Sequence, residues 1–208
     1  MTAPLPAGAT AERLARLRVV HPRPVVDLPA AERAIAALLQ ALGRDPVSEH
    51  LADTPRRVAD AYAEMLTAQP FDLTTFPHDE GYDELVLARD IPVQSLCEHH
   101  LLPFRGTAHV AYLPGDRILG LSKLARVVDL FARDLQVQER LTQQVADWLQ
   151  EHLAPRGVGV VIEAEHLCMS LRGVRAAGAR TSTSALRGLL REDARSRQEF
   201  FALSGTGR

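Results

Sequence analysis

The order in which hydrophobic patterns follow one another after residue 84 constrains the fold of this chain most strongly. Apolar residues first alternate with polar ones, then recur at helical spacing, and then gather in β-branched runs. These patterns predict two strands at 85–87 and 106–113, two helices at 122–131 and 137–149, and two strands at 158–162 and 180–185. Because the strands do not alternate singly with helices, the order favours an α+β domain, an antiparallel sheet with its helices on one face. The edges of so small a sheet need partners.

Two further helices are predicted upstream of this domain. Apolar residues recur at helical spacing from Ile35 to Leu42, and Gly43 follows as a helix stop. A second helix is indicated by Thr54 as its cap and by Pro55 in its first turn. Together they predict a helical segment ahead of the sheet.

The first 28 residues are rich in proline and show no sustained period, which is typical of a flexible arm. We therefore expect three parts in the chain. These are a flexible N-terminal arm at 1–28, an N-terminal helical segment at 29–80 and the α+β domain at 81–208.

The balance of charge excludes several kinds of partner. Lys and Arg number 24 and Asp and Glu number 26, so the net charge of −2 makes no case for nucleic acid or an anionic membrane. No apolar run reaches the length of a membrane span, and residues 1–10 lack the pattern of a signal peptide. We expect a cytoplasmic protein, in which a disulfide between Cys97 and Cys168 is disfavoured. Free thiols or metal ligands remain.

Each of the two cysteines lies close to a histidine. Cys97 precedes His100 by three residues in a segment bounded by prolines, and Cys168 follows His166 by two. Cys97, His100 and Cys168 would form a three-ligand zinc site of the catalytic type, with the fourth position left for water. If the segment around Cys168 is a strand, His166 lies on the same face as Cys168, because alternate residues of a strand share a face. His166 could then be a fourth ligand, which would close the site and make it structural. Ordinary buried cysteines with solvent-facing histidines are the third alternative.

Beside a catalytic zinc ion, His99 and His166 are suited to carry protons. The ion lowers the pKa of its bound water towards neutrality, and histidine itself titrates near neutral pH. Each histidine considered singly is more often a packing or surface residue.

Cations near the start of the predicted helix at 122–131 suggest a bound anion. Lys123 and Arg126 oppose the helix dipole there, which an anionic ligand would compensate, although a solvated lysine also explains the pattern. Arg172 and Arg57 are further candidates for a phosphate clamp, and neither is specific by itself.

Glu139 lies in the first turn of the next predicted helix, where the dipole alone favours an acid. Its functional interpretation needs a substrate. A carboxylate accepts two hydrogen bonds from the ring N1 and the exocyclic amine of guanine.

Several long motifs resemble GTP cyclohydrolase I and occur in that family's order. They are DTPRRV at 53–58, CEHHLLPF at 97–104, GLSK at 120–123, VQERLTQQ at 137–144 and HLCMSLRG at 166–173. The resemblance extends over residues 30–203 and leaves out the N-terminal arm.

The resemblance implies a role for each matching residue. Cys97, His100 and Cys168 match the zinc ligands, and His99 and His166 match the proton-handling histidines. The other matching residues contact GTP. Glu139 binds guanine, with Gln138 beside it, and Ser122 lies close to the ribose. The triphosphate is held by Lys123, Arg126, Arg172 and Arg57. Arg57 would reach in from a neighbouring subunit.

The resemblance also implies a fold, an assembly and a reaction. The fold is the tunnelling fold, and family members form toroidal homodecamers whose sheets join across subunits, which would satisfy the open edges. The reaction is the zinc-dependent hydrolysis of GTP to 7,8-dihydroneopterin triphosphate and formate, the first step of pterin and tetrahydrofolate biosynthesis. The chain departs from the family pattern at Asp60, where relatives often carry a basic residue that assists triphosphate binding.

Two other classes of function compete with this one. A nitrile reductase of the same fold would use a nucleophilic cysteine and a nicotinamide cofactor, but Cys97 placed beside His100 argues against it. A non-catalytic relative would hold zinc structurally, or would bind pterin or nucleotide without turnover.

Overall fold

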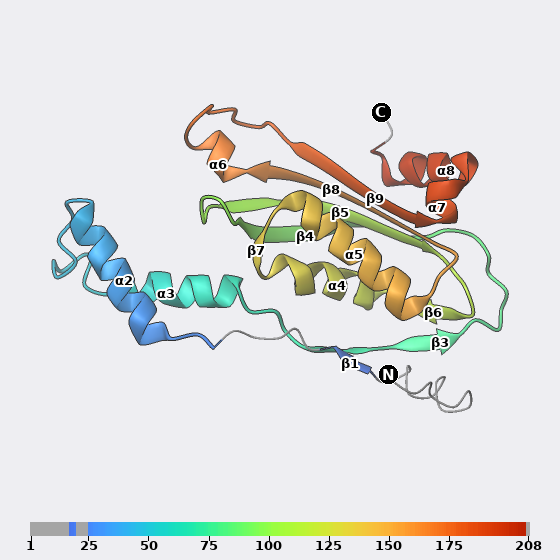
Figure 1. Cartoon of the computed structure of the whole chain (residues 1–208), viewed down its shortest axis with the longest axis horizontal. Helices are drawn as coiled ribbons and strands as arrows, with labels where there is room; N and C mark the ends of the chain where they lie inside the picture. Colours follow the sequence, from blue (N-terminus) through green and yellow to red (C-terminus); the bar gives the residue numbers. More distant parts are fainter. Residues whose placement is uncertain (1–16, 20–24, 207–208) are drawn as a thin grey trace, which may run out of the picture.

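The centre of the molecule is a five-stranded sheet, seen here in a computed structural model that describes residues 17–19 and 25–206 (Figure 1). Its strands, in spatial order, are β7 (Leu135–Gln136), β4 (Val86–Cys97), β5 (Pro103–Leu113), β8 (Gly157–His166) and β9 (Thr181–Gly188). The four long strands are antiparallel neighbours, which confirms the predicted order and sheet type. The two-residue β7 runs parallel to β4 and was not predicted, because two residues are too short to show a period.

Two helices, α4 (Ser122–Ala132) and α5 (Gln138–Leu153), cover one face of the sheet (Figure 1). Their apolar stripes meet the inward-facing residues of the central strands β5 and β8. The core between them includes Leu124, Val127, Val128, Leu141, Val145, Leu149, Val110, Tyr112, Val160 and Ile162. The α+β architecture, with α4 and α5 packed on one face of an antiparallel sheet, is therefore the one that the order of hydrophobic patterns predicts.

The opposite face of the sheet is partly covered by the C-terminal helices α7 (Leu189–Glu192) and α8 (Ala194–Ser204). Phe200 of α8 is completely buried there, together with Leu190 and Val161. The expectation that helices lie on one face thus holds for α4 and α5, and α8 adds a second layer. Helix α8 was not predicted, because its apolar residues are few and lie among arginine, serine and glutamate.

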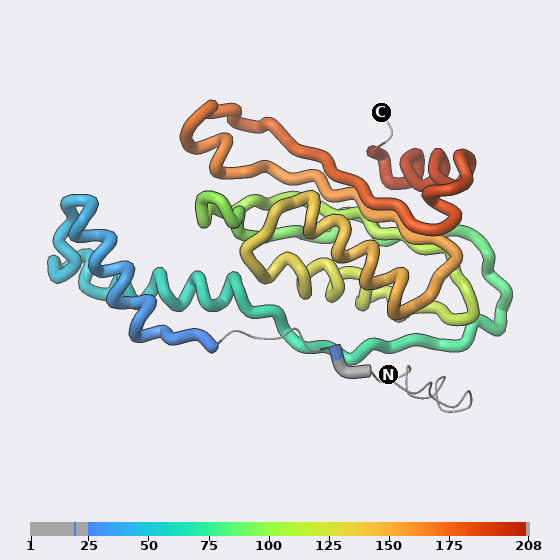
Figure 2. The backbone as a smooth tube through the Cα atoms, in the orientation of Figure 1, coloured from blue at the N-terminus to red at the C-terminus, as the bar shows by residue number. Residues whose placement is uncertain are grey.

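The N-terminal helices α2 (Leu28–Ala41) and α3 (Thr54–Met65) project together from the sheet, as the backbone trace shows most clearly (Figures 1 and 2). The side chain of Asp27 caps α2 by accepting a hydrogen bond from the amide of Ala30. Asp53 occupies the cap position of α3, one residue before the predicted Thr54. No residue of α2 is fully buried: Ile35 and Leu39 are half-buried, whereas Leu38 and Leu42 are exposed.

Part of the predicted N-terminal arm belongs to a small ribbon. Strand β1 (Leu17–Val19) pairs antiparallel with β2 (Phe71–Leu73), and β3 (Thr75–Pro77) pairs with β6 (Arg117–Leu119). Residues 1–16 and 20–24 of the arm lie outside the described residues, and the three predicted parts of the chain stay predictions. Across the described ranges, no helix combines the length and apolar character that crossing a membrane requires.

We predict that Gly159→Ala destabilises the protein through α8. A Cβ atom at this position would lie 2.9–3.0 Å from atoms of the Phe200 ring, closer than real Cβ contacts. Overpacking of this kind costs about 1–3 kcal/mol, which urea unfolding of the variant would measure. The double variant Gly159→Ala/Phe200→Leu should recover part of the loss. If the loss of unfolding free energy in the double variant equalled the sum of the losses in the two single variants, the clash between position 159 and Phe200 would not be the cause.

Candidate active site

A tight turn at the end of β4 presents the first two candidate metal ligands. Cys97 is the last residue of β4, and its backbone exchanges hydrogen bonds with Leu101 and Leu102 at 2.9 Å each. Leu101 adopts a left-handed conformation with φ 54°, and its carbonyl accepts a hydrogen bond from the Tyr62 hydroxyl of α3 at 2.9 Å. The turn is confined to the residues after Cys97, because those before it belong to the strand.

The third candidate ligand lies on a different element from its neighbouring histidine. Strand β8 ends at His166, and the short helix α6 (Leu167–Ser170) begins immediately after it. His166 and Cys168 therefore do not share one face of a strand. The register of β8 against β5 pairs His166 with Phe104, which brings α6 to the turn that follows β4.

The ligand atoms of Cys97, His100 and Cys168 all lie within 4.8 Å of one another. Both cysteines are free thiols, Cys97 buried and Cys168 half-buried. Burial is the main cause that raises the pKa of the Cys168 thiol, and the neighbouring Cys97 raises it further. Two sulfurs and one imidazole form a soft donor set that suits zinc, and three protein ligands leave a coordination position open. The group can hold a metal ion.

His166 stands beside this group and has another partner. Its Nε2 lies 2.7 Å from Oε1 of Gln138, and its ring stacks on Phe104 with centroids 4.6 Å apart. Burial lowers the pKa of His166, and the nearby Glu139 carboxylate opposes this shift. Within the described residues, the metal-binding group does not include His166, so the geometry disfavours the alternative of a closed four-ligand site.

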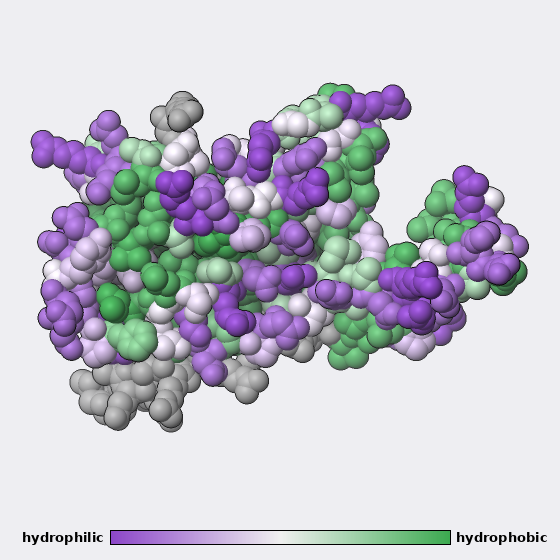
Figure 3. Space-filling model, turned by 180° about the vertical axis from the view of Figure 1, so that it is seen from behind, coloured by the Kyte–Doolittle hydropathy of each residue, from purple (hydrophilic) through white to green (hydrophobic). Residues whose placement is uncertain are grey.

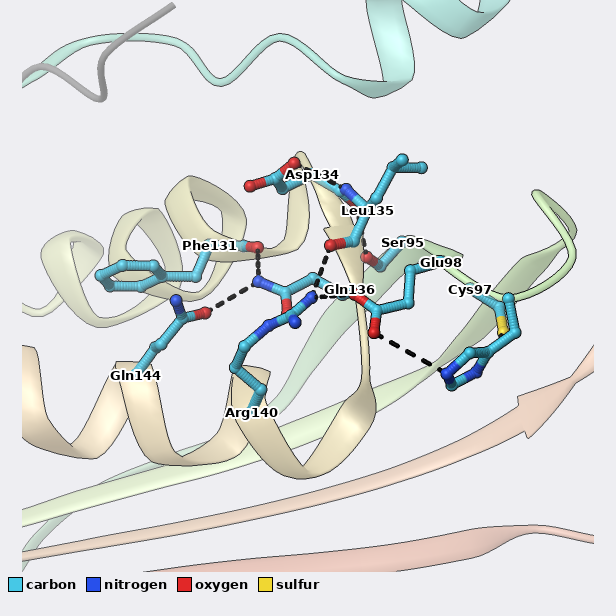
Figure 4. A network of polar contacts seen from close by, with 10 residues as sticks. Ser95, Cys97, Glu98, Phe131, Asp134, Leu135, Gln136, Arg140 and Gln144 are labelled. Atoms are coloured by element: carbon cyan, nitrogen blue, oxygen red, sulfur yellow. Dashed lines mark hydrogen bonds and ion pairs between the residues drawn. The ribbon is translucent and has the colours of Figure 1, made fainter.

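A polar network ties the turn after β4 to the start of α5 (Figure 4). The Arg140 guanidinium donates to Glu98 at 2.6 Å, to the carbonyl of Leu135 at 2.7 Å and to the side chain of Gln136 at 3.0 Å. Glu98 in turn lies 3.7 Å from Nε2 of His99. Glu98 and Arg140 were not predicted as site residues, because they lie in separate motifs and only the fold brings their charges together.

The two neighbouring residues predicted at guanine differ sharply in exposure. Glu139 is exposed and lies near enough to His166 to affect its pKa, whereas Gln138 is only 1% exposed. The side chain of Gln138 bonds to the protein at both of its polar atoms. A single turn of α5 thus presents one carboxylate to solvent and buries its neighbour.

Of the predicted triphosphate residues, Arg172 contacts the metal-binding group, with its Nη1 atom 3.4 Å from Nε2 of His100. Ser122, Lys123 and Arg126 lie towards the N-terminal end of α4, away from the end that leads into β7 (Figure 1). Lys123 instead places its ammonium 5.9 Å from the centre of the Phe71 ring.

Arg57 makes its ion pair within its own helix. It lies on the exposed surface of α3 and pairs with Asp53 at 3.0 Å. Asp60, the departure from the family pattern, pairs with Arg56 at 3.1 Å on the same helix. The Asp60 carboxylate is therefore partly neutralised within α3.

Fold and site together define an α+β protein with a two-thiol, one-imidazole metal-binding group at the end of an antiparallel sheet. Residues 31–205 match the family model of GTP cyclohydrolase I. The chain is 54% identical over 183 residues to "GTP cyclohydrolase 1" of Thermobifida fusca, covering 86% of this chain and 88% of that protein. It is 57% identical over 178 residues to the protein of the same name from Streptomyces coelicolor, covering 83% and 88%. The chain belongs to the GTP cyclohydrolase I family and is a hydrolase.

A solved structure, the archaeosine synthase QueF-Like in the apo form, overlaps this chain more weakly. It shares 17% sequence identity and a TM-score of 0.42, over 50% of this chain and 93% of its own. This level of similarity carries no argument about the site.

We predict that the group binds one Co²⁺ ion per chain, with the thiolate absorption expected of two cysteine ligands. Cys168→Ser should abolish the absorption, because it removes a sulfur from a site of three protein ligands. The matched variant His166→Ala should retain it, because His166 bonds to Gln138 instead. Loss of cobalt in a folded His166→Ala protein would show that His166 is a ligand.

Proposed function

We propose that this protein is a zinc-dependent hydrolase that converts GTP to 7,8-dihydroneopterin triphosphate and formate, the first step of pterin and tetrahydrofolate biosynthesis. The observation that carries the proposal is the convergence of Cys97, His100 and Cys168 beside His166 and Glu139, in a chain of the GTP cyclohydrolase I family. Zinc held by these three ligands would lower the pKa of a bound water and polarise the atom under attack.

The protein's own residues supply the proton transfers and the orientation of the base. His99 and His166 flank the metal ligands in the chain and are the residues that we assign to proton transfer. The exposed Glu139 carboxylate accepts from N1 and the exocyclic amine of guanine. Glu98 and Arg140 hold the turn that carries His99 against the helix that carries Glu139.

The triphosphate residues support an assembly in which neighbouring chains share a site. Helix α4 has 11 residues, and at about 1.5 Å per residue its two ends are separated by roughly 15 Å. Ser122, Lys123 and Arg126 lie in the N-terminal half of α4, the half farther from β7. We propose that a second copy brings these residues, and Arg57, to the metal-binding group.

Two features of the surface favour a homo-oligomer, which we propose to be a decamer. Among the residues that the structure describes, β9 has no neighbouring strand on its outer side, and an edge strand pairs readily with another chain. The projecting hairpin of α2 and α3 carries hydrophobic surface (Figure 3), including Leu38 at 52% and Leu42 at 66% exposure. Apolar residues at such positions gain free energy when a second chain covers them.

We predict that the zinc-loaded protein releases formate from GTP and yields a pterin that fluoresces after oxidation. His166→Ala should lower kcat by about 100-fold or more while zinc content is retained, because general acid–base groups contribute about 10²–10⁴-fold. Formate assay and metal analysis on the same samples check both parts. Absence of both products from the zinc-loaded wild-type protein would contradict the proposed function.

A second prediction concerns the sharing of sites between chains. Arg126→Ala and His166→Ala should each be nearly inactive alone. Co-expressed in equal amounts, they should recover about a quarter of the wild-type activity, because random pairing across a shared interface leaves that fraction of sites with both residues intact. Mixed oligomers that stay inactive would show that each chain builds its site alone.

A further inference from the structure

The side chain of Gln138 is enclosed by groups that fix its orientation. Its Nε2 atom lies 2.9 Å from the carbonyl oxygen of Thr181, 3.0 Å from that of Ile162 and 3.1 Å from the hydroxyl of Thr183. A carbonyl oxygen only accepts hydrogen bonds, so the NH₂ end of the amide has to face Thr181 and Ile162. A flipped amide would bring its oxygen against two other oxygens.

The threonine hydroxyls beside Gln138 agree with this orientation. The Thr142 hydroxyl donates to the backbone carbonyl of Gln138 at 2.7 Å and lies 2.7 Å from the Thr183 hydroxyl. Since each hydroxyl has one proton, Thr183 donates to Thr142 and remains an acceptor for the Gln138 amide. Every hydrogen bond in this buried network therefore has a determined direction.

The orientation of Gln138 decides which nitrogen of His166 carries a proton. Oε1 of Gln138 only accepts, and it lies 2.7 Å from Nε2 of His166, so the hydrogen of this bond is on Nε2. A neutral imidazole has one N–H, which leaves Nδ1 as its acceptor atom. Stacking on Phe104, with an interplanar angle of 11°, fixes the plane of the ring.

We infer that Gln138 is a positioning residue that holds His166 in the tautomer with its hydrogen on Nε2, so that Nδ1 is the nitrogen available to the reaction. This inference rests on the proposed function, in which His166 transfers a proton. It replaces the guanine-binding role that the family resemblance implies for Gln138, because the side chain is buried and its polar atoms are already engaged.

The first test reads the tautomer in the wild-type protein. Nitrogen NMR of the zinc-loaded, full-length protein, labelled at its histidine rings, distinguishes a protonated from an unprotonated ring nitrogen. The signal of His166 is assigned by its absence from His166→Ala. We expect a protonated Nε2 and an unprotonated Nδ1, and a protonated Nδ1 with a bare Nε2 would overturn the inference.

The second test separates positioning from substrate binding. Gln138→Met removes the acceptor with little change in volume, and we expect kcat for formate release to fall about 10- to 100-fold, as for other residues that orient an active-site histidine, with KM unchanged. Gln150→Met is the matched control, because Gln150 lies on the same helix and donates to the carbonyl of Pro155, away from His166. This control should keep its kcat.

The outcomes separate the inference from the function on which it rests. A rise in KM with kcat unchanged would mean that Gln138 binds substrate, and it would overturn the inference. Equal losses of kcat in the two variants would mean a purely structural role and would also overturn it. Absence of formate from the wild-type protein would contradict the proposed function instead, whereas the NMR measurement reads the tautomer without turnover.

Discussion

The antiparallel register of β5 against β8 is the constraint on which the site depends. Their pairing runs from Phe104 opposite His166 to Leu113 opposite Gly157, so the start of β5 and the end of β8 lie side by side. Cys97 and His100 precede β5, and Cys168 follows β8. A shift of this register by one residue would reverse the faces of β8 and separate the two cysteines.

The same end of the sheet also receives the start of α5. Strand β7 pairs with the last residues of β4, and α5 begins two residues later with Gln138 and Glu139. Arg140 then joins this helix to Glu98 in the turn. The candidate ligands, His166 and Glu139 are thus positioned by the ends of β4 and β8, by the tight turn after β4 and by the starts of α5 and α6.

Much of this arrangement could be predicted from the sequence. The changes of hydrophobic period predict the order of strands and helices, and the motif around Cys97 with the one around Cys168 predicts the metal-binding group. The roles of His99 and His166 in catalysis stay predictions, as do those of Lys123, Arg126 and Arg57. The sequence alone does not say whether Lys123 and Arg126 lie at the metal-binding group of their own chain, because their position depends on the length and direction of α4.

Other features depend on contacts between distant residues and could not be read from local patterns. Gln138 lies beside Glu139 in the chain, yet burial against β8 and β9 gives it a different environment. The pairing of Arg140 with Glu98 and the packing of Phe200 on Gly159 likewise follow only from the tertiary structure. Residue type and spacing predict which chemistry is available, and the packing decides which atoms take part.

The central claim is that three residues of this chain hold a catalytic zinc ion and leave its remaining position open. X-ray absorption spectroscopy at the zinc edge of the loaded wild-type protein tests this claim most directly. The account predicts two sulfur ligands, one nitrogen and one oxygen, the oxygen being that of water. Two sulfurs and two nitrogens would contradict it, because a second histidine would then close the site.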